Sequence, residues 1–178
     1  GMSLCYPHNS VPGGCCGFYQ PSFELVNSFQ VNENGLPYLN GEYRTKNSVT
    51  VKDESTVCKN DNSIAVDPRL DFAVGRMGIP YKDWGLPKTD WVRNPVNGGV
   101  FMPKKHVFSK AEFESGMGGK AYSDGWAPGS AINIQYLSVR DAKLLYAECL
   151  ANDGDLAGAM AQVNDIRRRA ALPVNIIK

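Results

Sequence analysis

Residues 136–172 read YLSVRDAKLLYAECLANDGDLAGAMAQVNDIRRRAAL and predict two helices folded back on each other. The first helix is expected from about Leu137 to Asn152. Gly154 suits the left-handed residue that ends a helix, and Asp155 can cap the first turn of the next one. The second helix is expected to end before Pro173, because proline cannot continue a helix. The stretch therefore predicts an α-helical hairpin.

Apolar side chains recur at steps of three and four on both expected helices, so that each carries an apolar stripe. The first stripe consists of Val139, Ala142, Tyr146 and Cys149, and the second of Leu156, Ala159, Met160, Val163, Ile166 and Ala170. Cys149 is accordingly expected to be a small core residue. Because a lone hairpin cannot cover both apolar faces, the stripes are expected to pack on a further element. Arg167–Arg169 are interpreted as a solvated helix end.

The composition is that of an ordinary globular domain, with 43% hydrophobic and 21% charged residues among 178. The formal net charge of +1 gives no electrostatic case for nucleic acid or an anionic membrane. No apolar run approaches the length of a membrane span. The five cysteines include the adjacent pair Cys15 and Cys16, but none stand at zinc-ligand spacing, and the pattern does not demand disulfides. No metal and no cofactor is predicted.

Residues 2–130 are predicted to be rich in loops with few short strands, which makes the fold class mainly α with extensive irregular loops. A short helix is expected within residues 22–32, and the alternation of Leu70, Phe72 and Val74 predicts a short strand. Asp67-Pro68-Arg69 is expected to form a turn with a charge pair. Residues 78–130 hold all three tryptophans among several prolines, so we expect an ordered loop region on a helical scaffold.

Four blocks of the sequence resemble one known family and occur in that family's order. They are Gln20–Phe29 followed by Asn34–Pro37; Asp67–Leu70; Gly75–Gly85; and, in the hairpin, Arg140, Leu144–Glu148, Ala159, Asn164 and Ile166–Ala170. These blocks are similar to the SusD/RagB family, surface glycan-binding lipoproteins of Bacteroidetes-type bacteria. The hairpin resembles the last helical repeat of those proteins, which is of tetratricopeptide type. The resemblance implies one SusD-like unit over residues 1–178, with the hairpin at 136–172.

The resemblance also implies a non-catalytic function in polysaccharide utilization. The intact protein would hold an oligo- or polysaccharide at the outer-membrane surface and pass it to a SusC-type TonB-dependent transporter. Family members are longer, so the chain is expected to be a fragment from the C-terminal half. The signal peptide, the lipid-anchor cysteine and earlier repeats would then lie outside it. Apolar faces that normally meet those repeats are expected to be exposed and to favour self-association.

Sugar recognition uses flat aromatic faces for the C–H surface of the ring and polar groups for its hydroxyls. Both kinds of side chain stand close together in residues 81–84, 90–94 and 122–126. The candidate glycan-binding residues are Tyr81, Asp83, Trp84, Trp91, Arg93, Tyr122 and Trp126. For each single tryptophan the competing interpretation is structural, because a tryptophan in a Gly- and Pro-rich loop most often anchors that loop to the core.

Catalytic residues are not predicted, since no nucleotide-binding, metalloprotease or hydrolase motif occurs. Two other functions stay open. A helical-repeat protein–protein interaction module predicts an exposed apolar groove on the hairpin, and burial of Tyr146 and Leu150 would count against it. A small glycoside hydrolase predicts two close carboxylates in the aromatic region, drawn from Asp83, Asp90, Glu112 and Glu114, whose separation sequence spacing does not establish.

Overall fold

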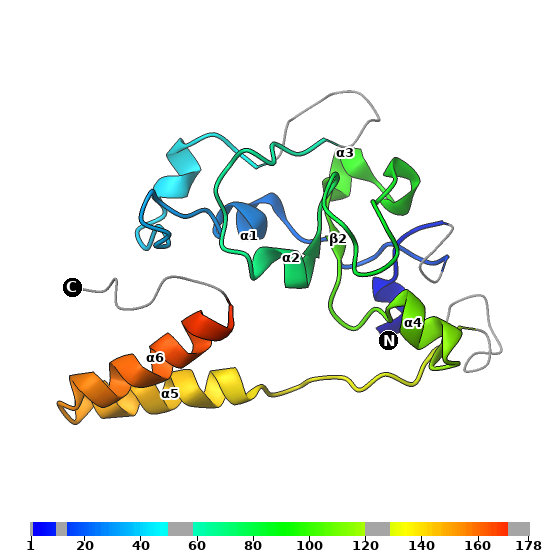
Figure 1. Cartoon of the computed structure of the whole chain (residues 1–178). Helices are drawn as coiled ribbons and strands as arrows, with labels where there is room; N and C mark the ends of the chain where they lie inside the picture. Colours follow the sequence, from blue (N-terminus) through cyan, green and yellow to red (C-terminus); the bar gives the residue numbers. More distant parts are fainter. Residues whose placement is uncertain (1, 10–13, 50–58, 120–128, 171–178) are drawn as a thin grey trace.

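The computed structural model describes residues 2–9, 14–49, 59–119 and 129–170, which form a loop-rich part followed by a helical hairpin (Figure 1). Helices are the main regular structure, and every strand among these residues is two residues long. The predicted fold class, mainly α with irregular loops and few short strands, is confirmed.

The loop-rich part contains short elements only. The short helix expected within residues 22–32 is present, and its first turn is capped by Ser22, whose hydroxyl accepts a hydrogen bond from the Leu25 N–H. The strands pair antiparallel as β1 with β2 and β3 with β4. In chain order the elements are η1 Met2–Cys5, α1 Phe23–Asn27, η2 Glu42–Thr45, α2 Leu70–Ala73, β1 Val74–Gly75, η3 Thr89–Trp91, α3 Pro95–Gly98, β2 Met102–Pro103, α4 Lys110–Glu114, β3 Gly118–Gly119 and β4 Gly129–Ser130.

The strand predicted from Leu70 to Val74 is wrong for most of its length. The Leu70 and Asp71 N–H groups donate to the carbonyl oxygens of Asp67 and Pro68. These bonds close the chain into the helical turn α2, and only Val74 and Gly75 continue as the strand β1. The alternating apolar residues do not share one buried face as they would in a strand, because the turn buries Leu70 and leaves Phe72 exposed.

The core of the loop-rich part joins segments that are far apart in the sequence. Its aromatic rings meet in pairs, such as Tyr6 with Phe108, whose ring centroids are 4.6 Å apart. Arg76 and Lys104 are buried cations within this part. The core residues are Tyr6, Val26, Val49, Leu70, Val74, Tyr81, Trp91, Val92, Val100, Phe101, Met102, Val107 and Phe108.

The predicted hairpin is confirmed as α5 (Val139–Asn152) and α6 (Leu156–Arg169), which lie side by side (yellow to red in Figure 1). Ser138 and Asp141 form a capping box at the start of α5. Gly154 has φ +88° in the turn, and the Asp155 carboxylate accepts a hydrogen bond of 2.8 Å from the Gly158 N–H. An ion pair between Lys143 and Asp165 links the two helices.

The apolar stripe of α5 is exposed to solvent. Tyr146 has 55% of its surface exposed, and the only buried residue of the helix is Ala147. The expectation of a core position for Cys149 is wrong, because its side chain is exposed. Two helices bury only the sides that face each other, so a wider stripe needs a third element to cover it. The prediction that Arg167–Arg169 form a solvated helix end is wrong for Arg167, because its side chain is buried.

The Asp67-Pro68-Arg69 turn forms as expected and carries a charge pair. The Arg69 guanidinium donates to both carboxylate oxygens of Asp67, at 2.5 and 2.9 Å. Burial raises the pKa of Asp67, but the hydrogen bonds and charge of Arg69, with the charge of Arg167, outweigh it and leave the pKa below its ordinary value. Because the Arg167 charge acts on Asp67, this turn lies within electrostatic reach of the last turn of α6.

We predict that Asp67→Asn lowers the free energy of unfolding at neutral pH by about 1–3 kcal/mol. A carboxyl whose folded-state pKa is lowered stabilises the fold above its unfolded-state pKa of about 3.9, and this contribution fades as the pH falls below that value. The difference between wild type and Asp67→Asn in urea denaturation should therefore shrink as the pH falls from about 4 through the lower pKa of the folded state. Glu33→Gln, at an exposed carboxylate, is the control. A difference that does not change with pH would contradict the prediction.

Candidate functional site

Tyr81 and Trp91, two of the predicted glycan-binding residues, lie in the core. Tyr81 has 0% and Trp91 2% of its surface exposed. Their rings meet edge to face with centroids 5.7 Å apart, and the Tyr81 hydroxyl donates to the Pro103 carbonyl. Neither ring presents a face to solvent on which a sugar can stack, so both residues anchor the aromatic loops.

Trp84 and Asp83 connect the loop at residues 81–85 to α4. The half-buried Trp84 ring lies 5.9 Å from that of Phe113, and its indole N–H donates to the Phe108 carbonyl at 3.1 Å. The Asp83 carboxylate accepts hydrogen bonds from the backbone N–H groups of Lys110 (2.6 Å) and Ala111 (3.0 Å). Desolvation raises the pKa of Asp83, but these bonds outweigh it, so the pKa lies below its ordinary value.

The carboxylates considered for a hydrolase are engaged in holding α4 or exposed on the surface. Besides Asp83, Glu112 accepts from the Ser109 N–H at 2.6 Å in the capping box of α4. Glu114 pairs with Lys110 at 3.7 Å. Because the Asp83 and Glu112 oxygens bond backbone N–H groups of a helix start, their arrangement is explained by capping.

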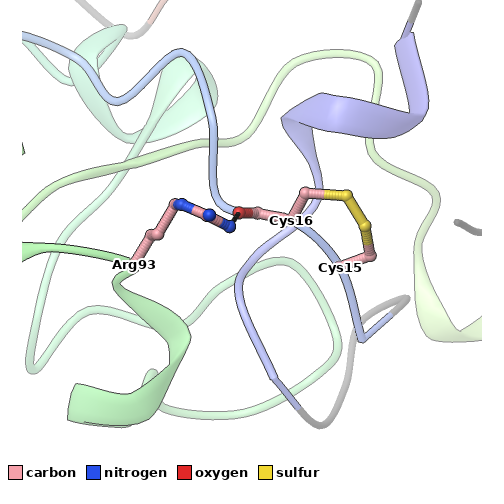
Figure 2. Close-up of a disulfide and its surroundings, with 3 residues drawn as sticks. All are labelled: Cys15, Cys16 and Arg93. Carbon is pink, nitrogen blue, oxygen red and sulfur yellow. Dashed lines mark hydrogen bonds between the residues drawn. A yellow bond between two sulfur atoms is a disulfide. The ribbon is translucent and has the colours of Figure 1, made fainter.

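Arg93 lies on the surface and is held from two sides. One terminal guanidinium nitrogen donates to the Cys16 carbonyl at 2.7 Å, as Figure 2 shows. The guanidinium carbon lies 4.3 Å from the centroid of the Phe18 ring. Cys16 forms a disulfide with Cys15, which the sequence pattern does not demand, and its backbone N–H donates to the Tyr6 carbonyl. Tyr122 and Trp126 lie outside the described residues.

Sequence reasoning missed an exposed apolar segment before and within α1. The large side chains Phe18, Tyr19, Phe23 and Leu25 are all exposed. The sequence feature that could have indicated this segment is the adjacent pair Phe18-Tyr19. It stands in a stretch rich in Gly, Cys and Ser, where no helix or strand is predicted that could bury two large aromatic side chains. This segment lies against residues 93–101, since the Gln20 amide donates to the Gly99 carbonyl at 2.8 Å and Phe23 meets Phe101 at 6.0 Å.

A hollow of about 310 Å³ lies beside this segment, at α1 and η2. One carboxylate oxygen of Glu24 accepts from the Tyr43 hydroxyl at 2.6 Å and from two Arg44 nitrogens at 2.6 and 2.9 Å. The Arg44 and Tyr43 hydrogen bonds hold the pKa of Glu24 below its ordinary value. The hollow thus combines an aromatic ring with fixed polar groups. Its lining residues are Phe23, Glu24, Asn27, Tyr43, Arg44, Lys46 and Ser48.

A comparison with models of protein families identifies the family of this chain. The family model described as the SusD family matches residues 1–175. The chain belongs to the SusD family. The resemblance of the four sequence blocks is thereby confirmed. No curated protein and no solved structure shows a significant match to the chain.

SusD-family proteins are carbohydrate-binding lipoproteins of the outer membrane that serve nutrient uptake, and they are generally non-catalytic. In the part of this SusD-family chain that the structure describes, no helix has the length and apolar character needed to span a membrane. Within the same ranges, no group of three His, Cys, Asp or Glu side chains is placed to hold a metal ion.

Trp84 provides a test of the anchoring role in this SusD-family chain. We predict that Trp84→Ala lowers the free energy of unfolding by about 2–3 kcal/mol, less than for a fully buried tryptophan because the ring is half-buried. Trp84→Phe keeps one aromatic ring but loses the second ring of the indole and its hydrogen bond, so the free energy of unfolding should fall by about 1–2 kcal/mol, less than for Trp84→Ala. Urea denaturation measures both changes. Equal stability of wild type and Trp84→Ala would show that the ring does not hold the loop.

Proposed function

We propose that this chain binds an oligo- or polysaccharide for uptake across the outer membrane and breaks no bond in it. Membership of the SusD family over residues 1–175 is the observation that carries this proposal. The exposed aromatic segment at residues 18–25 and the hollow beside it support the proposal, because they offer the two chemical features that sugars need: apolar ring faces and fixed polar groups.

The hollow is suited to a neutral sugar ring. Phe23 offers a partly exposed aromatic face at its edge. Tyr43 and Arg44 hold one oxygen of the Glu24 carboxylate, and its second oxygen makes no hydrogen bond with the described residues, so it can accept from a sugar hydroxyl. A carboxylate fixed before the ligand arrives loses little conformational freedom on binding.

The sequence-predicted residues enter this proposal in different ways. Trp84 and Arg93 keep surface that a ligand can reach, and Asp83 is exposed on the same loop as Trp84. Tyr81 and Trp91 support that surface from the core. Tyr122 and Trp126 stay predicted ligand contacts. The lipid anchor at the cell surface and the delivery of the glycan to a SusC-type TonB-dependent transporter are also part of the proposal.

A glycan array followed by calorimetry tests the proposal. We expect at least one oligosaccharide to bind, and Phe23→Ala and Glu24→Gln each to weaken binding about tenfold, through loss of a ring face and of a charged acceptor. Phe72→Ala removes an equally large exposed ring from α2 and should leave affinity unchanged. Urea denaturation of each variant separates lost binding from lost folding. Absence of binding to every glycan by wild type would overturn the proposal.

The exposed stripe on α5 favours a second function, the docking of a protein partner. The interaction-module hypothesis requires an accessible Tyr146, and this side chain is 55% exposed, as are neighbouring apolar residues of α5. Leu150 is half-buried. We propose that this stripe contacts a protein, and that in the isolated chain a second copy can take that place. The stripe and its exposed neighbours are Val139, Ala142, Leu144, Leu145, Tyr146 and Cys149.

Self-association through this stripe is directly measurable. We predict that the chain associates with rising concentration in sedimentation equilibrium under reducing conditions, which exclude a Cys149 disulfide. Leu145→Glu combined with Tyr146→Glu should return it to a monomer, because burying two carboxylates in an apolar contact is unfavourable. Leu39→Glu, on an exposed loop of the loop-rich part, is the control and should leave the association unchanged. A chain that is monomeric at all concentrations would contradict self-association.

A further inference from the structure

We infer that the surface formed by Phe18, Tyr19 and Arg93, here called the Arg93 surface, recognises an anionic group on the bound glycan. The shared chemistry is an oxyanion carried by a sugar ring, either the carboxylate of a uronic acid or a sulfate ester. The inference rests on the proposed function and adds to it the charge class of the ligand.

Arg93 differs from the other arginines of the loop-rich part in its charge balance. Arg44 pairs with Glu24 at 2.6 Å, Arg69 with Asp67 at 2.5 Å, and Arg76 with Asp71 at 2.7 Å. Within the described ranges, Arg93 makes no ion pair with a carboxylate. Among these residues its positive charge is therefore not paired with a carboxylate, whereas the other guanidinium groups of the loop-rich part are.

The Arg93 guanidinium is nevertheless fixed in position. The Cys16 carbonyl accepts from one terminal nitrogen at 2.7 Å, and the Phe18 ring supports the guanidinium carbon at 4.3 Å (Figure 2 shows the carbonyl contact). A guanidinium has five N–H donors in a planar fork. The contacts within the described residues leave most of these donors available, in the geometry that binds a carboxylate or sulfate through two parallel hydrogen bonds.

Aromatic surface adjoins this cation. Phe18 is 41% and Tyr19 67% exposed. Tyr19 has φ +58°, an uncommon conformation for a bulky residue that costs about 1–3 kcal/mol. Phe18 is the ring that contacts the guanidinium, and Tyr19 follows it in the chain, so a sugar ring that stacks on the exposed part of Phe18 has its substituents close to the Arg93 fork. The surface thus offers ring stacking and oxyanion binding to the same sugar residue.

The hollow at α1 provides a contrast within the same molecule. Its Arg44 is neutralised by Glu24, so the hollow suits hydroxyl groups, whereas Arg93 suits an acid. Phe18 and Phe23 are five residues apart, and an extended chain of that length spans at most about 18 Å. One oligosaccharide can therefore reach both places, which points to a polymer that carries acidic substituents along a chain of neutral hydroxyl-bearing rings.

Calorimetry with three oligosaccharides of one backbone tests the inference: an unsubstituted form, a form with uronic acid units and a sulfated form. For wild type we expect at least one charged form to bind about ten- to a hundredfold more tightly than the neutral form, as charge-assisted hydrogen bonds predict. Added salt should weaken that preference. Comparing the two charged forms tells a carboxylate ligand from a sulfate ligand.

Variants assign the preference to the Arg93 surface. Arg93→Gln should abolish the preference: it should weaken binding of the charged form about ten- to a hundredfold and that of the neutral form much less. Arg93→Lys keeps the charge without the planar fork and should retain only part of the preference. Lys105→Gln removes one positive charge from another exposed side chain and should change nothing. Tyr19→Ala is a second test in case Arg93→Gln reduces folding. It leaves the Arg93 contacts in place and should weaken binding of the charged form.

The possible failures are distinguishable. If the neutral form binds and the charged forms bind no better, the inference is overturned while the proposed glycan-binding function stands. If a charge preference exists but survives both Arg93→Gln and Tyr19→Ala, the anionic site lies elsewhere and the inference is equally overturned. If none of the three forms and no glycan on the array binds to wild type, the proposed function fails and the inference fails with it.

Discussion

The buried ammonium of Lys104 is the interaction on which the loop-rich part most depends. It donates to the carbonyl oxygens of Asp71 and Pro80 at 2.7 and 2.8 Å and lies 5.6 Å from the centroid of the Tyr81 ring. In irregular segments the backbone carbonyls lack partners from a helix or sheet, and leaving them unpaired inside the protein is costly. Burial lowers the pKa of Lys104. One side chain, directly after the strand β2, thus joins the helical turn α2 and the loop at Pro80.

The contacts of Lys104 inside the loop-rich part also determine which aromatic side chains stay exposed and can contact a ligand. Tyr81 lies next to Lys104 and packs edge to face against Trp91, so both rings belong to the core and are not available to a ligand. The segment at residues 17–23 then lies on the outer side of residues 93–101, where it is held by Gln20 and by the contact of Gly17 with Arg93. Exposed aromatics on a rigid base bind with a smaller loss of conformational freedom than aromatics on a mobile loop.

The hairpin could be predicted from the sequence because its signals are local. The predicted cap at Asp155 and the left-handed Gly154 act within a few residues of where they stand, and the structure confirms both. Whether another element covers the α5 stripe depends on contacts between distant parts of the chain, which the local pattern does not show. The prediction of a core position for Cys149 was wrong for this reason. The same holds for the candidate site. Tryptophans mark both anchors and ligand surfaces in sequence, and the neighbourhood of Phe18 with Arg93 joins segments that no spacing rule connects.

The contact between Arg93 and the Cys16 carbonyl has a consequence for the order of folding. The two residues are 77 positions apart, whereas the hairpin is made of contacts between neighbours along the chain. Local contacts form quickly and distant ones late. Until this contact forms, the aromatic side chains at residues 18–23 lack their native support, so we expect this segment to reach its native conformation after the hairpin.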